Sequence, residues 1–132
     1  MTNAITLAED LKPYLIPAFE RKAKSIIAID VRHLTSYTDT LIIIEGTSQR
    51  QVTSIADHLT KSLKDKKIKA LGVEGVKEGQ WALLDYGDVI IHIFESEKKS
   101  FYDIEGLWAD AKRIDLSGFQ DPTALGETND ES

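Results

Sequence analysis

The 132 residues of the chain, 42% hydrophobic and 29% charged, allow one globular domain with a hydrophobic core. The absence of cysteine excludes disulfide frameworks, thiolate zinc sites and cysteine nucleophiles. A net charge of −6 argues against a protein that binds nucleic acid by neutralising phosphates, whereas it is compatible with a basic protein partner. Because no apolar run could span a bilayer and the first residues lack the pattern of a secretory or transit signal, we expect a cytoplasmic protein without a membrane partner.

In chain order, the first predicted elements are a helix and two strands. Apolar residues at helical spacing indicate a helix over residues 7–19, which Pro13 and Pro17 should kink or divide. β-Branched and apolar residues dominate segments 25–31 and 40–46, which are therefore predicted to be strands. The second segment is apolar enough to lie in the centre of a sheet.

A second helix is predicted directly after the second strand. Ser48 and Gln51 have the spacing of an N-terminal capping box, and apolar residues at helical spacing follow them. The face expected to be buried consists of Val52, Ile55, Ala56, Leu59 and Leu63. A short third strand is expected around Lys69–Val73.

The C-terminal part of the chain predicts one more helix and a tail. Ser100 can cap a helix that runs to about Ala111. From Lys112 onward the apolar periodicity fades, so we expect an ordered domain over residues 1–111 and an acidic, disordered tail over residues 112–132. The element order α–β–β–α–β–β–β–α predicts an α/β fold, a single domain with a mixed sheet of about five strands and helices mainly on one face.

The segment "EGQWALLDYGDVIIHIFE", residues 78–95, predicts a β-hairpin with Tyr86 and Gly87 as its loop. That loop would place Asp85 opposite Asp88, and Trp81 opposite His92. Alternation of side chains puts only aliphatic residues on one face: Ala82, Leu84, Val89, Ile91 and Ile93. The other face mixes aromatic, aliphatic and charged residues: Trp81, Leu83, Asp85, Asp88, Ile90, His92 and Phe94. Such a face fits a protein-binding site, and it equally fits a sheet face that is half exposed.

Three other groups of residues have both a functional and a structural interpretation. Asp85 and Asp88 could form an acid/base or metal-binding pair, although carboxylates beside a tight turn more often cap it. The three histidines lack the spacing of metal ligands: His33, His58 and His92. Gly46–Arg50 could bind a phosphate on the backbone amides of a helix start, but ordinary capping after a strand is the simpler interpretation, since the lysine and glycines of a P-loop are missing.

Four motifs occur in order along the chain: "DVRHLTSYTD" at 30–39, "GTS" at 46–48, "WALLDYGDVIIH" at 81–92 and "YDIEGLW" at 102–108. With "GVEG" at 72–75, they make the chain resemble the ribosomal silencing factor family, also called Iojap or RsfS. The resemblance covers residues 7–111. The resemblance implies a fold similar to that of nucleotidyltransferases. It also implies no catalysis, no cofactor and no metal, since the helix after "GTS" lacks the D-x-D metal pair of those enzymes.

The same resemblance implies a repressor of translation that binds the ribosome. Family members dock on the large ribosomal subunit through its fourteenth protein, a basic protein at the subunit interface, and so block joining of the small subunit; they also support subunit maturation. The partner-binding residues that follow are Glu74, Trp81, Leu83, Asp85, Asp88 and His92. Trp81 would be the apolar anchor and the carboxylates would meet basic side chains. A homodimer is also implied, through part of this face or the N-terminal helix, with no nucleic acid as the main contact.

Two other functions are compatible with these residues. The first is a small nucleotide-binding or nucleotidyl-transferring enzyme that would use Gly46–Arg50 together with Asp39. The second is an obligate dimerisation module in which the hairpin face forms the contact between the two copies.

Overall fold

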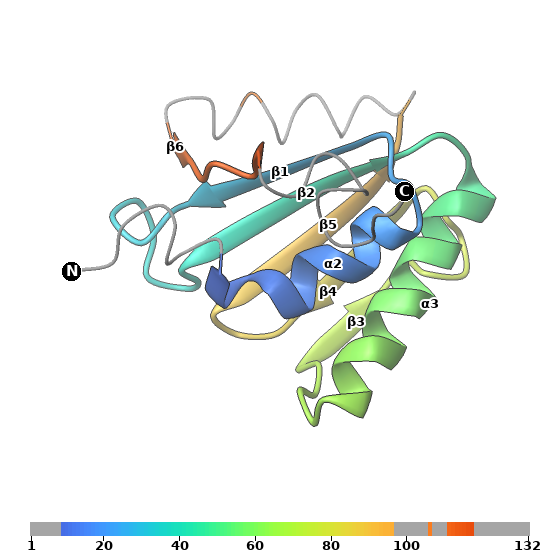
Figure 1. Cartoon of the computed structure of the whole chain (residues 1–132), viewed down its shortest axis with the longest axis horizontal. Helices are drawn as coiled ribbons and strands as arrows, with labels where there is room; N and C mark the ends of the chain where they lie inside the picture. The colour runs from blue at the N-terminus through green and yellow to red at the C-terminus, as the bar shows by residue number, and fades with distance from the viewer. Residues whose placement is uncertain (1–8, 97–105, 107–110, 118–132) are drawn as a thin grey trace, which may run out of the picture.

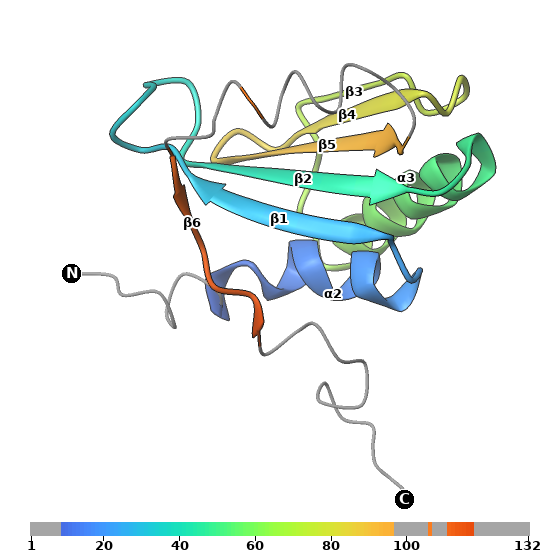
Figure 2. The same cartoon turned by 90° about the horizontal axis from the view of Figure 1, so that it is seen from above.

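The computed structural model describes residues 9–96, Gly106 and residues 111–117. In this part of the chain a six-stranded sheet carries two helices on one face (Figures 1 and 2). The elements are α2 (Lys12–Glu20), β1 (Ser25–Asp30), β2 (Thr40–Gly46), α3 (Gln49–Asp65), β3 (Gly72–Glu74), β4 (Trp81–Asp85), β5 (Val89–Glu95) and β6 (Lys112–Arg113). The strand order is β3-β4-β5-β2-β1-β6. The predicted α/β fold with a mixed sheet is confirmed, with six strands in place of about five.

β2 is a central strand because it is apolar on both faces. All seven of its residues are buried. It pairs in parallel with β5, whereas all other neighbouring strands are antiparallel. Alternate residues enter two separate cores: Ile42 and Ile44 pack with α2 and α3, while Leu41 and Ile43 belong to a second cluster on the opposite face.

α3 forms as the sequence predicts. The Ser48 hydroxyl accepts a hydrogen bond from the Gln51 amide at 3.1 Å, and the five apolar residues expected to be buried are buried. The Gln51 side chain departs from a capping box. Its Oε1 accepts from the Thr47 amide at 2.6 Å, and its Nε2 donates to the carbonyls of Arg21 and Lys22. Gln51 therefore ties the start of α3 to the end of α2.

The first expected helix divides shortly before the first of its two prolines. Residues 9–10 are helical, Leu11 forms a turn, and α2 begins at Lys12 with Pro13 in its first turn, where no helical N–H is needed. Pro17 lies inside α2, which continues to Glu20. The division therefore comes at Leu11, two residues before Pro13, and not at Pro17.

The third strand lies later in the chain than Lys69–Val73, where it was expected. After α3 the chain turns at Lys67, which has a φ of +66°, and it needs the following residues to reach the edge of the sheet. The Leu71 amide donates to the Asp85 carbonyl at 2.7 Å just before β3 begins. The strand itself occupies only Gly72–Glu74.

The hairpin of β4 and β5 has the predicted faces, apart from Asp88, but a different register. Trp81 lies opposite Phe94 rather than opposite His92. The two-residue loop is Gly87–Asp88 rather than Tyr86–Gly87. Its first residue, Gly87, has the positive φ of +85°, and the Asp88 amide donates to the Tyr86 carbonyl at 3.1 Å. Because a shift of two residues returns every side chain to the same face, the predicted aliphatic face is confirmed as part of the core beneath the helices.

The sheet continues past Ala111, where the domain boundary was predicted. Lys112–Arg113 pair with β1 as strand β6. Ile114 and Leu116 are each only 6% exposed and belong to the core that contains α2 and α3. The prediction of a tail is therefore wrong for residues 112–117. Two buried apolar residues that alternate with exposed ones are too few to show a strand period. The helix predicted from Ser100 and the tail over residues 118–132 lie outside the described residues, apart from Gly106, which is helical.

We predict that Ile114→Ala and Leu116→Ala each lower the free energy of unfolding by about 2–4 kcal/mol, because each leaves a cavity in the core. Urea denaturation followed by circular dichroism measures the change. Lys112→Ala is the matched control, since this neighbouring side chain is exposed. Equal stability of all three variants would show that the segment after Ala111 is not part of the folded core.

Candidate functional site

Five of the six predicted partner-binding residues share the sheet face opposite to α2 and α3. The register places Glu74 opposite Leu83, and Leu83 opposite His92, so these three form a row across β3, β4 and β5. Trp81 and Asp85 lie two residues either side of Leu83 on β4 and therefore share its face. We call Glu74, Trp81, Leu83, Asp85 and His92 the β4 patch.

Trp81 is the exposed aromatic residue of the β4 patch. Its side chain is 42% exposed, whereas Phe94, directly opposite on β5, is fully buried. The two rings stack with centroids 5.0 Å apart and an interplanar angle of 26°. The buried phenyl ring thus forms a platform for the exposed indole. Phe94 was placed on this face by alternation, but its role was missed because it depends on the register.

His92 completes this aromatic cluster. Its ring lies 5.8 Å from that of Trp81 and 5.9 Å from that of Phe94, nearly parallel to the latter. The Trp81 Nε1–H donates a hydrogen bond to His92 Nδ1 at 3.1 Å. Burial lowers the pKa of His92 to about 4, so the imidazole is neutral near pH 7 and its proton resides on Nε2.

Asp85 and Asp88 do not form the pair that the sequence suggested. Asp85 lies opposite Ile90, and its Oδ1 accepts a hydrogen bond from the Gly87 amide at 2.9 Å, which is the turn-capping role. Asp88 is an exposed loop residue that lines a hollow with Tyr14 of α2, where its charge contributes to raising the tyrosine pKa after the larger effect of burial. Asp88 therefore lies toward the helix side and outside the β4 patch.

Gly75 allows β3 to end closely against the start of β4. It has a φ of +77°, and a Cβ atom at this position would lie 2.0 Å from the Trp81 carbonyl oxygen. Such an approach to rigid backbone is possible only for glycine. The second glycine of the "GVEG" motif thus fixes the backbone that carries the exposed indole.

The residues of the alternative nucleotide site are far apart. Asp39 precedes β2 and Gly46 ends it, and a seven-residue strand separates its ends by about 20 Å. Two amides at the start of α3 are also engaged within the chain: that of Thr47 by Gln51 Oε1, and that of Gln51 by the Ser48 hydroxyl. The structure therefore supports the capping interpretation of Gly46–Arg50.

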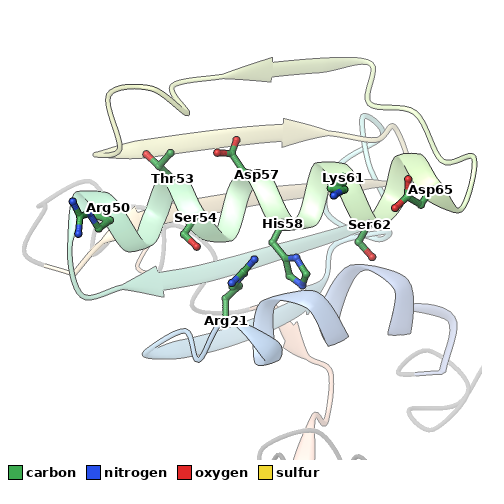
Figure 3. Close-up of a pocket in the computed structure, with 9 residues that line it drawn as sticks. All are labelled: Arg21, Arg50, Thr53, Ser54, Asp57, His58, Lys61, Ser62 and Asp65. Carbon is green, nitrogen blue, oxygen red and sulfur yellow. The ribbon is translucent and has the colours of Figure 1, made fainter.

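A hollow of about 730 Å³ lies along the exposed side of α3 and is shown in Figure 3. Its lining residues are Arg21, Arg50, Thr53, Ser54, Asp57, His58, Lys61, Ser62 and Asp65. Asp57, Lys61 and Asp65 follow one another at four-residue spacing, as in solvated helix faces. None of the predicted partner-binding residues lines this hollow.

Histidines and acidic residues are dispersed over the described part of the chain. No group of three His, Asp or Glu side chains within residues 9–96, Gly106 and 111–117 could hold a metal ion. His58 instead contacts Glu20 at 2.9 Å and so joins α3 to α2. None of the described helices combines the length and apolar character needed to cross a membrane.

Comparison with known proteins gives a match to one family over almost the whole chain. The model of the family described as ribosomal silencing factor during starvation, RsfS, matches residues 5–132. The chain belongs to the ribosomal silencing factor family. The predicted family resemblance is thereby confirmed.

Individual relatives agree with this assignment. The ribosomal silencing factor RsfS of Halalkalibacterium halodurans is 32% identical over 99 residues, which are 75% of this chain and 85% of the relative. A crystal structure from Bacillus halodurans matches with a TM-score of 0.74 at 29% identity, covering 82% of this chain and 98% of that one. The mouse protein named mitochondrial assembly of ribosomal large subunit protein 1 is 30% identical over 92 residues, or 67% of this chain and 40% of its own length.

We predict that Gly75→Ala lowers the free energy of unfolding by about 1–3 kcal/mol, because the methyl group would strike the Trp81 carbonyl and alanine would be strained at a positive φ. Urea denaturation measures the change. Gly72→Ala is the control, since a Cβ atom there would meet nothing within 4 Å. A Gly75→Ala variant as stable as Gly72→Ala would contradict the described contact.

A second prediction concerns pH. Burial disfavours the charged His92 imidazole in the folded protein, whereas the unfolded chain takes up this proton near pH 6.5. Between pH 6.5 and about 4 the unfolded state therefore binds more protons, and the free energy of unfolding falls as the pH is lowered, by about 3 kcal/mol over the full shift. His92→Asn removes this contribution, so the difference between the pH profiles of the two proteins isolates it.

Nuclear magnetic resonance of the His92 ring provides the direct check of this prediction. The titration midpoint should lie near pH 4 in the folded protein. A midpoint near 6.5, with parallel stability profiles for wild type and His92→Asn, would contradict it.

Proposed function

We propose that this chain binds the large ribosomal subunit through the basic fourteenth protein of that subunit and thereby blocks joining of the small subunit. The chain would act in the cytoplasm as a translational repressor, without catalysis. Membership of the ribosomal silencing factor family supports this proposal. The mouse relative, whose name refers to assembly of the large subunit, supports the choice of subunit and a role in its maturation.

The observation that carries the proposal is the exposed, fixed Trp81 with acidic neighbours. An aromatic side chain on a rigid strand is the type of residue that contributes most to protein–protein affinity. Glu74 is exposed one strand away, and Asp85 lies on the same face nearer the hairpin loop. Carboxylates around an apolar anchor complement lysine and arginine on a basic partner.

Blocking of subunit joining requires only that a folded domain occupies the interface. The family name describes silencing, and the relatives in Halalkalibacterium and Bacillus carry the same name, which denotes a regulatory role rather than an enzymatic one. The separation of Asp39 from Gly46–Arg50 further favours binding over nucleotide chemistry. A homodimer belongs to the same proposal, with its contact at the β4 patch or at the N-terminal helix.

We predict that Trp81→Ala weakens binding to the large subunit about 30-fold, because truncation of a central aromatic anchor typically costs 2 kcal/mol or more. Co-sedimentation of the purified chain with separated ribosomal subunits measures the effect. Tyr37→Ala is the matched control, since Tyr37 is an aromatic residue that is 58% exposed in the loop between β1 and β2. Unchanged binding by Trp81→Ala would contradict the assignment of the β4 patch.

Charge reversal at Glu74 tests the same face without disturbing the aromatic stack. Glu74→Lys should weaken binding, and more strongly at low salt, because it replaces an attraction to a basic partner with a repulsion. Asp65→Lys, at an exposed aspartate at the end of α3 and outside the β4 patch, has the same change in net charge. Equal loss of binding by both variants would point to net charge rather than to the patch.

A further inference from the structure

The indole of Trp81 is held in one orientation by two neighbours. A tryptophan that is 42% exposed could sample several rotamers, and ordering it on binding would reduce affinity. Here the buried Phe94 ring supports one face of the indole at 5.0 Å, and His92 Nδ1 accepts the indole N–H at 3.1 Å. Stacking limits the tilt of the ring, while the directional hydrogen bond fixes which edge points toward β5.

We infer that His92 is a positioning residue. It holds the Trp81 indole in its binding orientation and makes no direct contact with the ribosomal partner. This inference rests on the proposed function, since it assigns a role within the proposed binding face. It replaces the direct partner contact that the sequence suggested for His92.

The protonation state of His92 is consistent with this role. Only an imidazole that lacks a proton on Nδ1 can accept the indole N–H. Because burial lowers the pKa of His92 to about 4, the lone pair stays available over the whole range near neutral pH.

The same hydrogen bond determines which surface of the indole is offered to a partner. The Nε1–H is the single polar group of the tryptophan side chain, and it is already donated within the chain. A partner therefore meets the carbon surface of the ring, with the carboxylates of Glu74 and Asp85 as the polar contacts around it. This arrangement fits a basic protein surface in which an apolar depression is surrounded by lysine or arginine.

The test is a double-mutant cycle between positions 81 and 92, with affinity for purified large subunits as the readout. His92→Leu replaces the imidazole with an apolar side chain of similar size and removes the acceptor. We expect about fivefold weaker binding, because the freed indole would then have to be ordered when the complex forms. His92→Asn is the conservative variant, because its Oδ1 is attached to Cγ as Nδ1 is, and it should restore most of the affinity. In a Trp81→Phe background, where there is no indole N–H, His92→Leu should change the affinity less than twofold.

A second readout uses the free protein. The indole Nε1–H resonance of Trp81 should shift in His92→Leu and stay close to the wild-type position in His92→Asn. An unchanged indole resonance in His92→Leu would overturn the hydrogen bond. Circular dichroism shows whether each variant is folded.

The outcomes separate the inference from the proposed function. Equal loss of affinity from His92→Leu in the wild-type and Trp81→Phe backgrounds would overturn the positioning role and assign His92 a direct contact. No loss in either background would also overturn it. Failure of the wild-type chain to bind large subunits would overturn the proposed function and with it the binding role of His92, whatever the indole resonance shows.

Discussion

The parallel pairing of β2 with β5 is the constraint on which the rest of the structure depends. Seven consecutive residue pairs join these strands, from Thr40 with Val89 to Gly46 with Glu95. Two parallel strands cannot be joined by a tight turn, so the chain between them must cross over and return. It does so as α3, β3 and β4, which places the helix over one face and the hairpin at the side. The half-exposed outer face of that hairpin is a consequence of this topology.

The sheet face away from the helices is buried at the central strands and exposed near β3. On the face away from the helices, Leu41, Ile43 and Ile90 are buried in the second core. Toward β3 the same face becomes exposed. His92 on β5 and Leu83 on β4 are half-buried, whereas Trp81 on β4 and Glu74 on β3 are exposed. The β4 patch is thus continuous with a buried core. The exposed Trp81 ring therefore lies on a strand of the sheet and not on a loop. Rigidity of this kind reduces the entropic cost of binding.

The sequence predicted what depends on side-chain alternation and helical spacing. The apolar faces of the hairpin and α3 followed from those patterns, as did the strand over 40–46. The hairpin register did not, because Gly87 can serve a two-residue loop as its first or its second residue, and only cross-strand pairing decides between Tyr86–Gly87 and Gly87–Asp88. That difference separated Asp85 from Asp88 and placed Phe94 beneath Trp81. Strand β6 was missed because two residues are too few to show a period, and the exposure of Trp81 depends on neighbours remote in sequence.

Electron cryomicroscopy of the chain bound to purified large subunits tests the central claim most directly. We predict that a basic protein of the large subunit covers the β4 patch, with the indole of Trp81 buried against its surface and α3 facing away from that protein. A complex in which Trp81 and Glu74 face solvent, or in which α3 makes the contact with the subunit, would contradict the proposed mode of binding.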